Sequence, residues 1–124
     1  MHRVIDAMNV IGSRPDGWWR DRSAAIERLV AHLDRWAAEV DDDVTVVLEQ
    51  PPSRPLPAEQ IEIVWAPQPG PNSADKEILR RLDGWLAEGE VTVVTSDRDL
   101  AERAQAKGAA AESAAAFRDR LDAL

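Results

Sequence analysis

Apolar residues recur along this chain at two different spacings. Short β-branched runs alternate with longer stretches in which apolar positions recur every three or four residues. The short runs predict buried strands, and the longer stretches predict amphipathic helices. The predicted strands cover 3–7, 44–48, 61–65, 91–95 and the short stretch 109–111. The predicted helices cover 22–40, 73–88, 97–107 and 113–123.

The connections between these elements are marked by proline and glycine, which favour loops. Loops are predicted over 8–21, 51–57 and 67–71. Only the link between the second and third strands lacks a predicted helix. This order predicts a mostly parallel central sheet with helices on both faces, a Rossmann-like three-layer α/β fold. We expect residues 1–124 to form one domain, because the length is ordinary for a domain and no linker divides it.

Composition narrows the class of protein. The chain contains no cysteine, which excludes disulfides, cysteine-type zinc sites and thiol catalysis. It has no apolar run of signal-peptide or membrane-span length, so we expect a cytoplasmic protein. The net charge of -8 argues against a broad nucleic-acid-binding surface. Local positive charge beside aromatic groups is predicted at Trp18–Arg22 and at the pair Arg80 and Arg81.

Polar side chains follow two of the predicted strands at the point where each strand ends. Asp6 and Asn9 follow the first strand, and Ser96, Asp97 and Asp99 follow the fourth. Open α/β sheets place their ligand sites at the carboxyl ends of strands, near the switch in strand order. Carboxylate and amide oxygens are the ligands that Mg²⁺ and Mn²⁺ prefer. The pattern therefore predicts a divalent metal site at this edge of the sheet.

Each of these acids also has a purely structural interpretation. Asp75 lies in the first turn of a helix that Asn72 or Ser73 can cap, where a negative charge favours the helix dipole. Ser96 and Asp99 resemble a capping box, and Asp6 can accept hydrogen bonds from loop amides. The functional interpretation is favoured because these carboxylates, if they converge at one edge, repel one another strongly unless a cation is present.

The tandem tryptophans Trp18 and Trp19, followed by Arg20, lie in a predicted loop and not on an apolar stripe. They could stack on the bases of a single-stranded substrate, where stacking contributes about 1–3 kcal/mol per base. The alternative is that one or both pack over the edge of the sheet as a lid on the core. The remaining tryptophans occupy apolar positions of predicted elements and are predicted core residues: Trp36, Trp65 and Trp85.

Three segments in this order match a known pattern: Ile5–Gly12, Ser73–Ile78 and Val93–Leu100. A downstream stretch from Ala106 to Phe117 also fits. On these segments the chain resembles the NYN domain family of the PIN-like nucleases, and most closely its YacP-like branch. The resemblance spans nearly the whole chain. It implies a PIN-like α/β fold and a metal-dependent ribonuclease activity, with RNA as the partner.

The resemblance also implies roles for individual residues. It places the acids that hold Mg²⁺ or Mn²⁺ at Asp6, Asp75, Asp97 and Asp99, with Asn9 beside them. Substrate contacts are then expected from the two serines, which precede helices, and from the loop: Ser73, Ser96, Trp18, Trp19 and Arg20. Whether the chain is a monomer or a homodimer stays open.

The chain departs from the family pattern at two places. Ala7 stands where a glycine commonly follows the first aspartate, and Leu48-Glu49 stand where Phe-Asp is common. Neither change removes an expected ligand, but the role of Glu49 is left open. Two other functions remain: a catalytically weak RNA- or protein-binding module, and a structural protein whose acids only cap helices.

Overall fold

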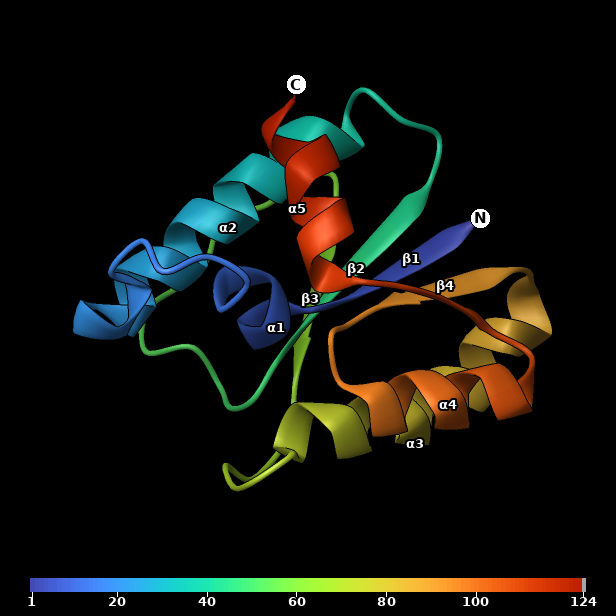
Figure 1. The fold of residues 1–124 in the computed structure, drawn as a ribbon. Helices are drawn as coiled ribbons and strands as arrows, with labels where there is room; N and C mark the ends of the chain where they lie inside the picture. Colours follow the sequence, from blue (N-terminus) through green and yellow to red (C-terminus); the bar gives the residue numbers. More distant parts are fainter. Residues whose placement is uncertain (124) are drawn as a thin grey trace.

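The computed structural model describes residues 1–123, and a parallel sheet runs through its centre (Figure 1). The sheet has the strand order β3-β2-β1-β4-β5, and every neighbouring pair is parallel. This arrangement confirms the predicted α/β fold. The strands are β1 (His2–Asp6), β2 (Asp43–Leu48), β3 (Glu62–Trp65), β4 (Val91–Val94) and β5 (Ala110–Glu112).

Helices cover both faces of the sheet, as expected for three layers (Figure 1). One face carries α1 (Ala7–Ile11), α2 (Arg22–Ala37) and α5 (Ala114–Asp122). The other face carries α3 (Ser73–Glu88) and α4 (Arg98–Lys107). A short 3-10 helix, η1 (Trp18–Arg20), precedes α2. Within residues 1–123, no helix has the length and apolar character that crossing a bilayer requires.

Successive strand residues point to opposite faces, so the sheet contributes side chains to two separate hydrophobic cores. Ile5 joins the core under α1, α2 and α5, where Trp36 and Phe117 meet edge-to-face at 5.3 Å between ring centres. Val4 joins the core under α3 and α4 together with Ile78. Complete burial of each such side chain contributes about 1.5–3 kcal/mol. The two cores fix how the helices, and therefore their first turns, sit above the sheet.

Arg3 is a buried charge at the centre of this packing, with only 7% of its surface exposed. Its guanidinium group donates to Asp42 at 3.0 Å and to Glu112 at 2.6 Å. The same group lies over the rings of Trp36 and Phe117, 5.6 and 5.7 Å from their centres. One side chain on β1 thus joins the segment before β2 to the edge strand β5.

The structure differs from the sequence-based expectations at three places. Residues 8–21, predicted as a loop, contain α1 and η1, and the helix predicted over 22–40 ends at Ala37. Trp36 and Trp85 are buried as predicted, but the prediction for Trp65 is wrong, because this residue is 41% exposed. Trp65 is the last residue of β3, an edge strand whose outer side has no neighbour.

We expect Arg3→Ala to lower the free energy of unfolding by about 3 kcal/mol, because it leaves the partly buried Asp42 without its partner and Glu112 with Arg120 alone. Urea unfolding measures this loss. The matched control is Arg54→Ala, which removes an exposed ion pair with Glu27 and should cost less than about 1 kcal/mol. Equal effects of the two substitutions would show that the Arg3 network is not a stabilising centre.

Candidate active site

The predicted acids lie at the carboxyl edge of the sheet, at the switch in strand order. From β1 the chain adds β2 and β3 on one side, then returns to place β4 on the other side of β1. Asp6 ends β1, and Asp97 lies just beyond β4. Loops at such a switch point diverge and leave room for a ligand.

Asp6 is the buried centre of the site, with 2% of its surface exposed. Its Oδ2 atom accepts hydrogen bonds from Asn9 Nδ2 at 2.6 Å and from Thr95 Oγ1 at 3.1 Å. Asn9 lies on α1, which starts directly after Asp6 and returns the amide group to the carboxylate. The Asn9 Oδ1 atom accepts from the Ser96 N–H at 3.2 Å. Asn9 therefore bridges the ends of β1 and β4.

Thr95 forms a second bridge that the sequence interpretation missed. It is 4% exposed, and its hydroxyl donates to Asp6 while accepting from the Asp97 N–H at 3.1 Å. Its own backbone N–H donates to the carbonyl of Glu112 on β5 at 3.0 Å. The only signal in the sequence was a hydroxyl at the end of a β-branched run, two residues before Asp97. In an α/β sheet such a hydroxyl faces the switch point.

Two helix starts bring further carboxylates to this edge. Asp97 caps α4 by accepting from the Leu100 N–H at 3.0 Å, so the capping residue is Asp97 and not Ser96 as predicted. Asp75 lies in the first turn of α3. That helix is anchored by Ser73, whose hydroxyl donates to the carbonyl of Glu49 at 2.8 Å.

The carboxylates are close enough to shift one another's ionisation. Burial raises the pKa of Asp6 to about 6, although hydrogen bonds from Thr95 and Asn9 oppose the shift. Burial also raises the pKa of Asp75 to about 7, reinforced by its hydrogen bonds to Asp97 and Asp6 and by their charges. The pKa of Asp97 is lowered, first by the Leu100 N–H and then by Asp75. Asp75 is therefore the member of the cluster that keeps its proton to the highest pH, and it shares that proton with Asp97 through their hydrogen bond.

This donor set has the chemistry that a hard divalent cation requires. All the groups are oxygen donors, and the shared proton marks a place where positive charge is favoured. Within residues 1–123, no three acidic or histidine side chains already surround one point as ligands. Binding of an ion would therefore require Asp75 to lose its proton and the carboxylates to turn toward the ion.

The family model of the YacP-like NYN domain matches residues 3–124. The chain belongs to the YacP-like NYN domain family. Its structure is similar to the crystal structure of Rae1 (YacP) from Bacillus subtilis, with a TM-score of 0.79 and 18% identity over 99% of this chain and 74% of that one. The crystal structure of a tryptophan-to-leucine variant of that protein is also similar, with a TM-score of 0.81 and 18% identity over 99% of this chain and 75% of that one. No curated protein matches the chain.

Several predicted site residues of this NYN domain lie outside the carboxylate cluster. Asp99 is exposed and pairs with Arg103 at 3.0 Å, one turn along α4. Glu49 stands near enough that its charge raises the pKa of Asp6, which makes it a peripheral acid. The structure thus brings Asp6, Asp75 and Asp97 together but not Asp99, whose role as a ligand stays a prediction.

The tandem tryptophans of the NYN domain have different surroundings. Trp18 is half-buried and packs against the core under α2, with the guanidinium group of Arg22 5.3 Å from its ring centre. Trp19 meets Trp18 edge-to-face at 5.8 Å and is 52% exposed. Arg20 is exposed. Trp18 therefore covers the core and also lines an adjacent cleft, whereas Trp19 and Arg20 are exposed.

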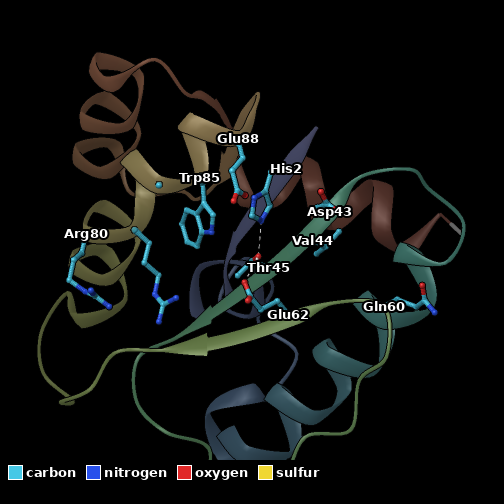
Figure 2. Close-up of a pocket in the computed structure, with 11 residues that line it drawn as sticks. His2, Asp43, Val44, Thr45, Gln60, Glu62, Arg80, Trp85 and Glu88 are labelled. Atoms are coloured by element: carbon cyan, nitrogen blue, oxygen red, sulfur yellow. Dashed lines mark hydrogen bonds between the residues drawn. The ribbon is translucent and has the colours of Figure 1, made fainter.

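A large cleft of the NYN domain lies at the opposite, amino edge of the sheet, with a volume of about 710 Å³. Figure 2 shows His2, Thr45 and Glu62 side by side across three strands, with Trp85 beside them. His2 Nε2 is 2.7 Å from the Thr45 hydroxyl, which in turn donates to Glu62 at 3.2 Å. Burial lowers the pKa of His2. These polar groups satisfy one another, so size alone does not make this cleft the active site.

We expect the metal-free protein to lose stability as the pH rises from about 4 to 7. The native pKa values of Asp6 and Asp75, about 6 and about 7, both exceed the ordinary aspartate value of 3.8. The native state therefore holds more protons than the unfolded state in this range, and the free energy of unfolding falls with pH. Thermal unfolding in the presence of EDTA measures the slope.

Asp75→Asn provides the matched test, because it removes the shared proton and the repulsion together. Its melting temperature should vary less with pH and exceed that of the wild type by about 4 °C near pH 7.5, allowing for solvent screening of this half-buried group. Identical pH profiles for the two proteins would show that the three carboxylates do not interact.

Proposed function

We propose that this NYN domain is a metal-dependent ribonuclease that hydrolyses RNA phosphodiester bonds at the cluster of Asp6, Asp75 and Asp97. The carrying observation is the convergence of these carboxylates at the switch point, where burial and then the neighbouring carboxylates raise the pKa of Asp75 to about 7. Carboxyl groups that titrate far from their ordinary range in a ligand-binding position are typical of catalytic sites. The nuclease-like, RNA-related character of the family supports the same conclusion.

A Mg²⁺ or Mn²⁺ ion would be held by Asp6, Asp75 and Asp97, with Asp99 as a further ligand if it leaves Arg103. When bound, such an ion lowers the pKa of a water and offsets the charge that develops on the phosphate. Attack of water on phosphorus forms one P–O bond and breaks the bond to the 3′ oxygen. The products are a 5′-phosphate and a 3′-hydroxyl, which takes the proton released by the water.

The chain's own residues would orient these groups. Thr95 and Asn9 hold the Asp6 carboxylate in one position, so that its free oxygen lone pairs face the edge of the sheet. The Ser96 hydroxyl and the first turn of α4 could hold a phosphate oxygen. Asn9 already accepts from the Ser96 N–H, so it couples substrate binding to the carboxylate.

Basic residues follow two of the carboxylates in the sequence. Lys76 follows Asp75, and Arg98 follows Asp97; both bases are exposed. Within residues 1–123, neither has a carboxylate within ion-pair distance. These side chains can draw RNA phosphates to the site despite the net charge of -8.

We expect Asp97→Asn and Asp6→Asn each to lower the rate of RNA cleavage at least about 100-fold, since each removes a carboxylate from the metal site. The assay uses linear and circular RNA with Mn²⁺, Mg²⁺ or EDTA. Circular RNA offers no ends and therefore tests for the internal cleavage that we expect. Circular dichroism verifies that the variants are folded.

The matched control for this assay is Asp83→Asn, which makes the same chemical change at an exposed residue that pairs with Lys107 on the outside of α3 and α4. This control should cleave like the wild type. Asp99→Asn should lose less activity than Asp97→Asn, because Asp99 must first leave Arg103. Cleavage that persists in both Asp6→Asn and Asp97→Asn would refute the proposed site.

The net charge of -8 favours a second candidate, a module that binds RNA or protein, retains the metal site and cleaves weakly or not at all. Both functions require metal binding. We expect Mn²⁺ to raise the melting temperature of the wild type, with about 2.7 kcal/mol of stabilisation at 100 times its Kd. The Asp75→Asn variant should show a smaller shift. Stabilisation without any cleavage would favour the binding module, and no stabilisation would favour purely structural acids.

A further inference from the structure

A second cleft, of about 350 Å³, lies between α2 and α5 on the face of the sheet that these helices cover. We call it the α2–α5 groove. Its floor is apolar and includes Leu29, and Trp18 forms one wall. Its charged and titratable lining is mostly basic (Arg28, His32, Arg35 and Arg118), with Asp16 as the one acid. The carboxylate cluster is not part of its lining.

The basic residues of the α2–α5 groove share one helix face. Arg28, His32 and Arg35 are spaced four and three residues apart on α2, which places them in one row. Arg28 and Arg35 are exposed, and within residues 1–123 neither has a carboxylate within ion-pair distance. In a protein of net charge -8, two uncompensated guanidinium groups line one wall of a cleft.

The acids near the groove are already engaged. Arg118 lies 3.3 Å from Asp16 and 3.4 Å from Asp122. Arg14 pairs with Asp119 at 2.5 Å and with Asp122 at 2.6 Å. These ion pairs neutralise the carboxylates on the α5 side, so the charges of Arg28 and Arg35 are left to act on a ligand. The groove therefore favours an anion with an apolar part.

The groove is connected to the candidate active site through Trp18. The guanidinium group of Arg22 lies 5.3 Å from the centre of the Trp18 ring. Arg22 also lines a smaller cleft of about 140 Å³ together with Met8 and Glu49 at the end of β2. Glu49 is the acid whose charge acts on Asp6. Basic and aromatic side chains thus lead from the carboxylates, past η1, to the groove.

We propose that the α2–α5 groove binds a single-stranded segment of the RNA substrate, away from the bond that is cut. This inference rests on the proposed ribonuclease function. Arg28 and Arg35 would contact phosphates, and the Trp18 wall with its apolar floor would accept a base, the combination typical of single-strand binding. An acidic peptide is the competing occupant, but it offers no flat apolar group for this wall.

The test uses Asp97→Asn protein, which cannot cut, and a fluorescein-labelled oligo(U) of about 20 nucleotides. Arg28→Gln/Arg35→Gln should raise Kd about tenfold at moderate salt, since two phosphate contacts are lost. The slope of log K against log salt should fall by about 1.4, at 0.7 for each phosphate of a single strand. The control Arg54→Gln/Lys107→Gln removes the same charge from exposed ion pairs elsewhere and should change neither quantity.

Cleavage assays separate this inference from the proposed function. The double variant, with Asp97 intact, should cut a short RNA of about four nucleotides like the wild type, because such RNA does not reach the groove, while it cuts long RNA less efficiently. If the Arg28→Gln/Arg35→Gln substitutions change neither the Kd for RNA nor its salt slope while the wild type cleaves normally, the proposed RNA binding by the groove is refuted and the ribonuclease function is retained. Poly-glutamate serves as a probe for an acidic peptide. If the double variant loses binding to poly-glutamate but binds RNA unchanged, the groove is a site for acidic protein segments and not for RNA. A wild type that neither binds nor cuts RNA refutes both proposals.

Discussion

The buried carboxylate of Asp6 is the interaction on which the arrangement of the site depends. A charged group with 2% exposure costs free energy unless hydrogen bonds or a cation compensate it. Here the compensation comes from Asn9 and Thr95, which belong to the two segments that follow β1 and precede α4. The need to satisfy this one carboxylate therefore fixes the position of the other site residues.

The parallel sheet brings the site residues to one edge of the molecule. Because all neighbouring strands are parallel, each strand delivers its following loop to the same edge. The first turns of α3 and α4 then add Asp75 and Asp97, whose backbone surroundings are set by helix geometry. The packing of the two cores holds these carboxylates close together although like charges repel. A proton, or a cation in its place, is therefore favoured among them.

Much of the fold follows from the sequence because strands and helices have distinct apolar periods. The bounds of α3 agree with the predicted 73–88, and the order of elements fixes the edge where Asp6 and Asp97 lie. The bridging role of Thr95 was not predictable, since it depends on contacts with β1 and β5. Nor was the pairing of Asp99 with Arg103, because Asp97 and Asp99 carry the same local capping signal. The short helix α1 was predicted as part of a loop because glycine and proline follow it closely in the sequence.

The hydrogen bond between Thr95 and Asp6 joins residues separated by 89 positions along the chain. The central strand β1 is synthesised first, yet its pairing with β4 must wait until most of the sequence has emerged. A nascent or truncated chain that ends before β4 therefore has its first aspartate but no pocket around it. The hydrogen bonds that hold the Asp6 carboxylate are therefore completed only after long-range closure of the sheet, a late step in folding.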